Sequence, residues 1–352
     1  MKKTLAAVAI LGAFAGSALA DVTVYGAADF GLAWTHAEDG SDKVTFESGM
    51  DTASRVGFLA SEKIGDVTVG VKFENSFSMD SGKEGKIDTV GDSFFNRETR
   101  LYVAGAYGEV GFGRFGALDS TTGPYNLAGS SIHATTGING IGKTSVVFLG
   151  QNSRVENSVA YKSPKFGGFQ AWAQYATTTA GENTHEGERY YALAARYTAG
   201  DLMGTLIASY EDGADAAAAK GQETKAYTAA LSYNFGVTKL MAAAQYFDNA
   251  EATVGIVGTA VKDKARVDGY GLTLGAVTPV AGGSLKTQLG YMDAEAVAGE
   301  VKYDAWNAGV LYYYNFSKRT SVYGGLGYTV QGMDGADDVK TVNGAIGLIH
   351  NF

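Results

Sequence analysis

The chain has 352 residues and a net charge of −9, with 49 Gly, 3 Pro, 21 Tyr, 17 Phe and no Cys. The lack of Cys excludes disulfides as a support for the fold, and the acidic balance argues against a nucleic-acid partner, which selects a basic face. No apolar run approaches the roughly 18 residues that a membrane-spanning helix needs. Two classes remain, a secreted soluble protein and an outer-membrane β-barrel.

The first 20 residues have the three parts of a secretory signal peptide. Lys2 and Lys3 form a basic start, residues 5–14 are apolar, and Ala18-Leu19-Ala20 is a small-residue cleavage site. We therefore predict a signal peptide over residues 1–20 and one barrel domain over residues 21–352.

From Asp21 onward apolar and polar residues alternate, which is the period of a strand with one apolar face. One face of the first segment carries Val22, Val24, Gly26, Ala28, Phe30, Leu32 and Trp34. Sixteen such segments follow one another, with short turns alternating with longer polar connections. The predicted long connections are Ala37–Ala53, Ser78–Ser93, Phe115–Thr144, Thr178–Glu188, Glu211–Thr224, Asp248–Ala265, Ala294–Val301 and Gln331–Val339. An even strand number with this alternation is typical of outer-membrane barrels.

The alternative of a soluble sandwich would also bury one face of each sheet. Aromatic residues gather at the strand ends instead, as in the girdles at two membrane interfaces; they are Tyr161, Phe169, Tyr233, Phe235, Tyr246, Tyr314, Phe316 and Phe352. We predict an all-β fold, a 16-stranded antiparallel transmembrane β-barrel, in which the first and last strands pair because open edges are costly in lipid.

The third long connection, residues 115–144, is rich in Gly, Ser and Thr and has no sustained helix or strand period. So long a loop in a compact domain usually has a function. We predict that it folds into the lumen and sets the width and charge of a pore. It offers one acid, Asp119, with Lys143 and His133 as possible bases.

Four bases fall on the lumen-facing side of strands beside this loop: Arg55, Lys72, Arg100 and Arg154. Charged side chains on the lipid face would cost about 2–4 kcal/mol at the midplane, which favours the lumen. They predict a weak anion preference, unless they are solvated residues with no collective role. Acids in the outer loops, such as Glu38-Asp39 and Asp337-Asp338, would oppose that preference at the mouth and bind divalent cations at the lipopolysaccharide layer.

Arg114 shares the strand face of Val110 and Phe112, which would point it at lipid. Either a β-bulge redirects this side chain or the strand has already left the wall.

Two glycine-rich motifs suggest nucleotide binding. Residues 137–144 match the P-loop pattern and residues 111–116 match the dinucleotide pattern. Both mechanisms need a helix after the motif, and neither motif has one. The four His residues lie far apart, so we predict no metal site, no cofactor and no catalytic residues.

The chain resembles the trimeric general porins of Gram-negative bacteria, especially the neisserial and β-proteobacterial family. The resemblance lies in residues 24–26, 54–58, 113–114, 157–164, 166–169 and 317–320, in this order along the chain. It implies a homotrimer, an inward third loop, Arg114 in the pore and Phe352 as the assembly signal. Many relatives oppose a basic wall to an acidic loop, whereas this loop has Asp119 alone.

The leading hypothesis is passive diffusion of ions and small hydrophilic solutes across the outer membrane of a Gram-negative bacterium. An outer-membrane adhesin or structural barrel that acts through its surface loops is the alternative. A barrel hydrolase using His350 is a third hypothesis, although no nucleophile is identifiable.

Overall fold

The computed structural model describes residues 21–38, 40–85, 93–131, 141–177, 189–212, 223–255 and 262–352, so the predicted signal peptide lies outside the described residues. The strands are β1 (Asp21–Ala37), β2 (Asp42–Ser48), β3 (Arg55–Ile64), β4 (Val67–Ser76), β5 (Glu98–Gly105), β6 (Gly108–Gly116), β7 (Arg154–Lys162), β8 (Phe169–Thr177), β9 (Arg189–Ala199), β10 (Leu202–Asp212), β11 (Thr224–Asn234), β12 (Lys239–Gly255), β13 (Lys262–Val280), β14 (Gly283–Ala296), β15 (Lys302–Asn315), β16 (Thr320–Met333) and β17 (Val339–Asn351). A short helix α2 (Leu127–Ser131) and a 3-10 turn η2 (Thr144–Val146) lie between β6 and β7.

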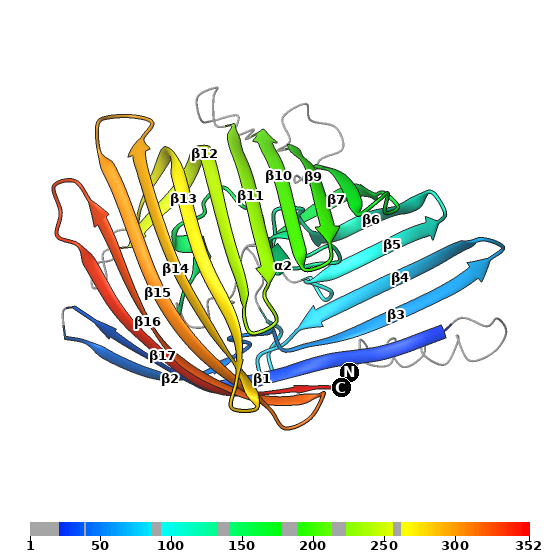
Figure 1. The fold of residues 1–352 in the computed structure, drawn as a ribbon, viewed down its shortest axis with the longest axis horizontal. Coiled ribbons are helices and arrows are strands. Elements are labelled where there is room, and N and C mark those ends of the chain that lie inside the picture. Colours follow the sequence, from blue (N-terminus) through cyan, green and yellow to red (C-terminus); the bar gives the residue numbers. More distant parts are fainter. Residues whose placement is uncertain are drawn as a thin grey trace.

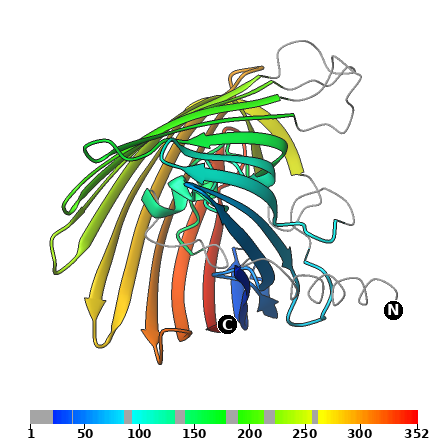
Figure 2. The same cartoon turned by 90° about the vertical axis from the view of Figure 1, so that its right-hand side faces the viewer.

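The strands form one closed antiparallel barrel. Each wall strand pairs with its neighbours in the chain, and β17 returns to pair with β1, from Ala27 opposite Asn351 to Ala37 opposite Thr341. Figure 1 shows the colours passing round the wall until β17 lies beside β1, and Figure 2 shows the same strands from the side. The wall consists of β1 and β3 to β17, which confirms the predicted 16-stranded barrel.

The additional strand, β2, corrects the prediction that residues 37–53 form a loop. The first half of β1 pairs with β3, from Asp21 opposite Ser61 to Ala27 opposite Arg55. The second half of β1 would otherwise have an open edge on that side. β2 covers this edge from Phe30 opposite Ser48 to His36 opposite Asp42. The ring of Phe46 stacks on Phe30 with a centroid separation of 5.7 Å, which adds a cross-strand contact to the pairing.

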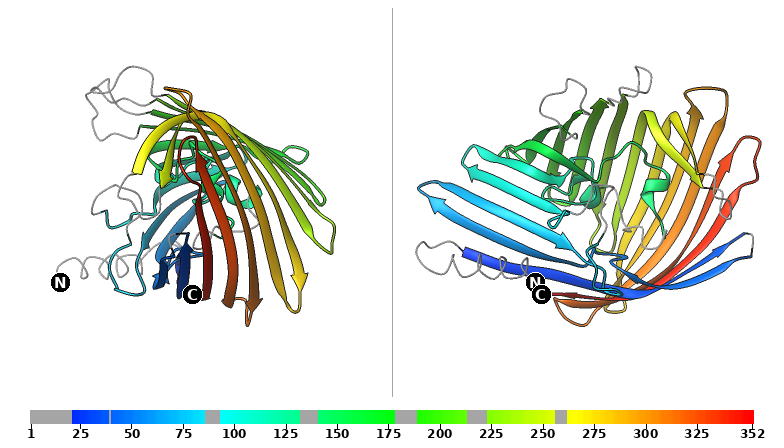
Figure 3. Two further views of the ribbon diagram at one scale, coloured as in Figure 1. Left: turned by 90° about the vertical axis from the view of Figure 1, so that its left-hand side faces the viewer. Right: turned by 180° about the vertical axis from the view of Figure 1, so that it is seen from behind.

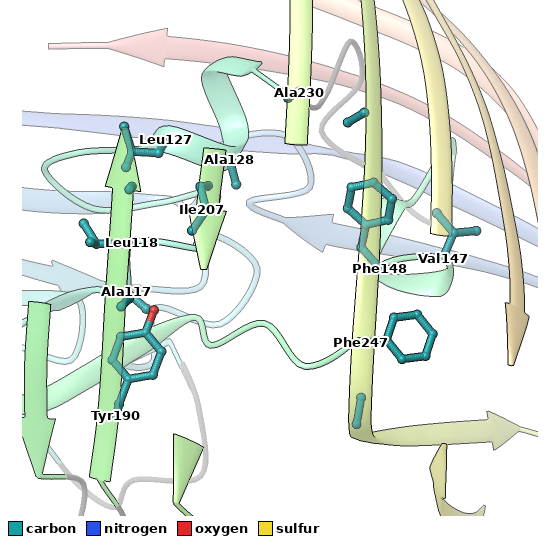
Figure 4. Packing of buried hydrophobic residues seen from close by; sticks show 14 of the residues in the cluster. Ala117, Leu118, Leu127, Ala128, Val147, Phe148, Tyr190, Ile207, Ala230 and Phe247 are labelled. Carbon is teal, nitrogen blue, oxygen red and sulfur yellow. The ribbon is translucent and has the colours of Figure 1, made fainter. Parts of the chain in front are cut away.

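Burial alternates along the wall strands as the two-residue period predicts. On β9 the side chains of Tyr190, Ala192 and Ala194 are buried, whereas Tyr191 and Leu193 between them are exposed. The apolar core lies on the buried face, between the strands and the segment that joins β6 to β7. Figure 4 shows Leu118 and Ala128 of that segment near Ile207 of β10.

Two predicted loops contain more regular structure than their composition indicates. Residues 248–265 were predicted as a connection, yet β12 continues to Gly255 and β13 begins at Lys262. A register shift between Phe247 and Ala250 contains Asn249 at φ +54°, and this bulge lets the strand bend and continue. In the third connection β6 extends to Gly116, while residues 132–140 lie outside the described part.

The chain's last residue completes the closure of the barrel. Gly26 of β1 and Phe352 exchange two backbone hydrogen bonds, of 2.9 and 3.0 Å. The Phe352 ring occupies the place where a Cβ on Gly26 would lie. Glycine at position 26 therefore allows the close approach of the Phe352 ring and of the Arg55 carbonyl to the first strand.

Candidate functional site

Eight charged side chains from β3 to β7 form one connected group on the wall, which we name the wall cluster. Its members are Arg55, Lys72, Glu74, Arg97, Glu98, Arg100, Glu109 and Lys162. It lies on the face that carries the segment joining β6 to β7, since Arg100 and the hydroxyl of Tyr125 both lie over Gly111.

Glu74 is the acceptor at one end of the wall cluster. Its carboxylate lies 3.3 Å from Lys72 Nζ, 3.3 Å from Arg97 Nε and 3.6 Å from Arg55 Nε. The hydroxyl of Tyr25 also donates to it at 2.8 Å. Three bases therefore share one carboxylate, which holds their side chains together against the wall.

Glu98 and Glu109 continue the cluster across β5 and β6. Lys72 Nζ and Arg100 Nε each lie 2.9 Å from Glu98, and Arg100 Nη1 lies 2.8 Å from Glu109. Lys162 Nζ reaches Glu109 at 3.3 Å. The cluster thus contains five bases and three acids, an excess of two positive charges.

The strand register explains this arrangement. Lys72 lies directly opposite Arg100, and Glu74 directly opposite Glu98, so like charges face each other across the β4–β5 pair. Directly opposed like charges are destabilising, whereas diagonal neighbours are still within reach of long side chains. Lys72 therefore pairs diagonally with Glu98, and Lys72 and Arg100 also pair with the glutamates two residues away on their own strands. Each charge of the wall cluster thus lies beside an opposite one.

Three of the predicted pore residues, Arg55, Lys72 and Arg100, are brought together in this cluster. The prediction did not identify Arg97, Glu98 and Glu109 as their partners. Sequence alternation does place Glu98 on the same strand face as Arg100, but the contacts depend on registers between strands that are far from obvious in the chain.

Arg114 lies in a β-bulge, one of the two possibilities left open by the sequence. The β6–β7 register shifts between Gly113 and Phe115, with Gly113 at φ +122°. A Cβ at Gly113 would meet the carbonyl oxygen of Thr99. Arg114 donates to the carboxylate of Glu156 at 2.8 Å and to the carbonyl of Asn96 at 3.2 Å, so it ties three segments together.

Arg154 is displaced from the predicted strand face by the same bulge. Two residues of β7, Glu156 and Asn157, lie opposite Arg114 alone, and Asn157 has φ +44°. Every residue before this point therefore changes face, and Val155 is buried in the core in place of Arg154. Arg154 donates to the carbonyl of Arg97 at 2.9 Å, at the entry to β5.

Asp119 does not face pore water, contrary to the prediction. Its side chain is 1% exposed and accepts a hydrogen bond of 2.9 Å from the hydroxyl of Tyr190 on β9. Burial raises the pKa of Asp119 to about 6, while hydrogen bonds from Ser209 and Tyr190 act in the opposite direction. Asp119 is a buried anchor for the start of the loop.

The segment from Ala117 to Ser153, which we name the β6–β7 segment, is attached to the barrel in both of its described parts. Arg196 of β9 donates at 3.0 Å to the carbonyl of Leu127, in α2, and Figures 1 and 3 show this helix within the curve of the wall. On the other side, Gln288 of β14 donates to the carbonyl of Gly142, and Asn307 of β15 donates to that of Lys143, both at 2.8 Å.

Apolar contacts support these attachments. Leu118, Leu127 and Phe148 are buried in the cluster that also contains Ile207 of β10 and Phe247 of β12. Figure 4 shows Leu118 and Leu127 near Ile207, and Phe148 near Phe247. The described parts of the β6–β7 segment therefore contact β9 to β15 along the buried face of the wall.

A second segment, residues 49–54 between β2 and β3, is fixed to the same face by Asp29. The buried Asp29 carboxylate accepts the backbone N–H groups of Asp51 at 2.7 Å and Thr52 at 2.9 Å. It also accepts the hydroxyl of Tyr323, from β16, at 2.8 Å. We name residues 49–54 the inner strap.

Within the described residues no group of three or more His, Asp and Glu could hold a metal ion. His36 pairs with Asp42 at 3.1 Å, and His350 lies 2.9 Å from the hydroxyl of Thr320. His133, His185 and residues 137–140, the first half of the motif at residues 137–144, lie outside the described part of the chain.

Comparison with known proteins identifies the family and the fold. The model of the Gram-negative porin family matches residues 5–332. The chain is 28% identical over 344 residues to outer membrane porin protein 32 of Delftia acidovorans, which covers 93% of this chain and 89% of that protein. It is 25% identical over 358 residues to the major outer membrane protein P.IB of Neisseria meningitidis, with both chains covered completely.

Solved structures give the same fold. An anion-selective porin from Comamonas acidovorans superposes with a TM-score of 0.70 at 23% identity, covering 95% of this chain and 100% of that one. The trimer form of OmpT of Vibrio cholerae superposes with a TM-score of 0.67 at 16% identity, covering 95% and 99%.

Proposed function

We propose, on the premise that this chain belongs to the Gram-negative porin family, that its channel passes anions in preference to cations. Family membership makes the protein an outer-membrane porin, a non-enzymatic channel for ions and small hydrophilic solutes. The proposal concerns the sign of its ion selectivity and the residues that set it.

The observation that carries the proposal is the excess of two positive charges in the wall cluster. Its three glutamates reduce the positive field that the sequence alone predicts, so the preference is expected to be weak. The anion-selective porin from Comamonas acidovorans has the same fold, which supports the same sign here.

The β6–β7 segment is the constriction in this proposal. Its attachments to β9 and to β14–β15 support a position across the lumen, opposite the wall cluster. Arg55, Lys72 and Arg100 would then face the passing ion. Asp119, Arg114 and Arg154 would position the segment and the strands that flank it.

The experiment is a reversal potential under a KCl gradient across a planar bilayer. We expect the sign that indicates anion preference, and we expect the double substitution Arg55→Gln with Arg100→Gln to move the potential toward zero, because it removes the excess charge. Lys43→Gln on the exposed β2 strand is the matched control. An unchanged potential in the double variant would reject the wall cluster as the selectivity element.

The protein's partners follow from the same proposal. A homotrimer would show as conductance steps in groups of three, as expected for a chain with the fold of a trimeric structural neighbour. The exposed apolar side chains of the wall would contact outer-membrane lipid. The outer acids would contact lipopolysaccharide through divalent cations.

A further inference from the structure

A cavity of about 660 Å³ lies between the β6–β7 segment and the inner strap. Hydroxyl and amide side chains line much of it, among them Ser120, Thr122, Asn126 and Asn152. Two acids and two bases also line it: Asp51 of the strap, Glu251 of β12, Lys143 of the β6–β7 segment and Lys286 of β14. Such a lining offers a small solute many donors and acceptors at short range.

Lys286 differs from the bases of the wall cluster. Each of those five bases pairs with a glutamate, whereas none of the ion pairs among the described residues includes Lys286. Its ammonium group lies 4.0 Å from the ring centroid of Tyr313, a cation–π contact. Lys286 makes no close ion pair with a described carboxylate, although the charge of Asp51 acts on it, so its ammonium group can also bind an anionic group from a solute.

Asp51 is placed beside Lys286 by the same tyrosine. The Tyr313 hydroxyl donates to Asp51 Oδ1 at 2.8 Å, while the face of the ring carries Lys286. Asp29 fixes the backbone of Asp51 by accepting its N–H. One ring and one buried carboxylate thus hold a positive and a negative group at the edge of one cavity.

We propose that this cavity is a subsite for zwitterionic solutes of the α-amino acid class. Lys286 binds the solute carboxylate, Asp51 binds its ammonium group, and the hydroxyl and amide lining accommodates a small polar side chain. A solute with only a negative charge would be attracted by Lys286 and repelled by Asp51, so the pair favours a molecule that carries both charges. The inference rests on the proposed function in that the lumen must conduct.

The test measures how solutes of similar size reduce the KCl current through the protein in a planar bilayer. The probes are serine as the zwitterion, glycerol as the neutral molecule and lactate as the anion. We expect serine to reduce the current at lower concentration than either of the others. We expect Lys286→Met and Asp51→Asn each to weaken the serine effect about tenfold, equivalent to about 1.4 kcal/mol.

Matched variants separate binding from folding. Met keeps the aliphatic stem of Lys286, and Asn keeps an oxygen for the Tyr313 hydroxyl, so a KCl conductance near wild type shows an intact channel. Exchanging the charges, with Lys286→Asp and Asp51→Lys together, should restore part of the serine effect. Lys43→Met, on the exposed β2 strand, should change nothing.

Two outcomes overturn the inference while leaving the proposed function in place. If serine and glycerol reduce the current equally in a conducting channel, there is no zwitterion subsite. If Asp51→Asn strengthens the lactate effect and leaves that of serine unchanged, Lys286 is a simple anion site. A change in reversal potential without a change in the serine effect would concern the wall cluster alone.

Discussion

At the scale of single residues, Asp119 shows how a carboxylate from a polar loop can be buried and hold that loop against the barrel wall. It is buried beside Tyr190 at the start of the β6–β7 segment, where the ionised form is poorly solvated. Because its pKa in the folded protein is raised from 3.8 to about 6, the folded state binds more protons than the unfolded state between these values. Stability therefore falls as the pH rises through this window.

We predict that acidification from pH 7.5 to pH 5 strengthens the attachment of residues 117–131 by about 1.4 kcal/mol, because this range crosses only the upper unit of the window, from pH 6 to pH 5. Hydrogen exchange of residues 117–131, corrected for the intrinsic effect of pH, should show more protection at pH 5. Asp119→Asn, which carries no charge at either pH, should remove this dependence. Protection that decreases on acidification would contradict the prediction.

At the scale of elements, the paired bulge of β6 and β7 decides which side chains face the β6–β7 segment. Gly113, at φ +122°, allows the bulge because a Cβ there would meet the Thr99 carbonyl. In β7 the residues that follow the bulge place Ser158 and Ala160 on the buried face, whereas before the bulge it is Val155 that is buried. One irregularity thus exchanges a basic side chain for an apolar one in the core.

We predict that Gly113→Val destabilises the folded barrel by roughly 1–3 kcal/mol, because it adds a clash to a strained backbone. The measurement is the urea midpoint for unfolding in detergent, with the tryptophan fluorescence of the protein as the signal that monitors unfolding. Gly299→Ala is the control, since Gly299 has φ +104° with open space around it. Equal effects of the two substitutions would show that backbone strain alone, without the bulge geometry, matters here.

The sequence predicted the elements better than their irregularities. Alternation identified the wall strands because each has one face against lipid and one face inward, whatever its neighbours are. It could not identify β2, whose formation depends on the length of β1, or the shift of Arg154, which depends on the pairing of β6 with β7. Asp119 was misplaced for a related reason, since only the folded segment brings Tyr190 to it.

The candidate site was predicted in part for the same physical reasons. The alternation of strand faces selected Arg55, Lys72 and Arg100 as lumen residues, since a charge on the lipid face is costly, and the structure brings the three together in the wall cluster. The compensating carboxylates and the Tyr313-centred pair of Asp51 and Lys286 come from contacts across distant strands. No local pattern encodes such contacts.

At the scale of the whole molecule, the net charge of −9 and the basic wall cluster have opposite effects on a passing ion. Asp337 and Asp338 lie in an exposed turn between β16 and β17, far along the chain from the half-buried charges of β3 to β7. Exposed charges act over about 30 Å at 0.01 M salt and only about 3 Å at 1 M, whereas partly buried charges are screened less. The acids of the mouth should therefore oppose anion entry mainly at low salt.

We predict that Asp337→Asn together with Asp338→Asn raises the anion-to-cation permeability ratio in about 0.01–0.03 M KCl and changes it little in 1 M KCl. Reversal potentials at fixed concentration ratio, measured across this range, provide the test. The Arg55→Gln with Arg100→Gln variant is the counterpart, because its effect should persist to higher salt. If the mouth variant changed the ratio equally at both salt concentrations, Asp337 and Asp338 would have to act at short range on the ion path, and selectivity could no longer be divided between a screened mouth and a less screened wall.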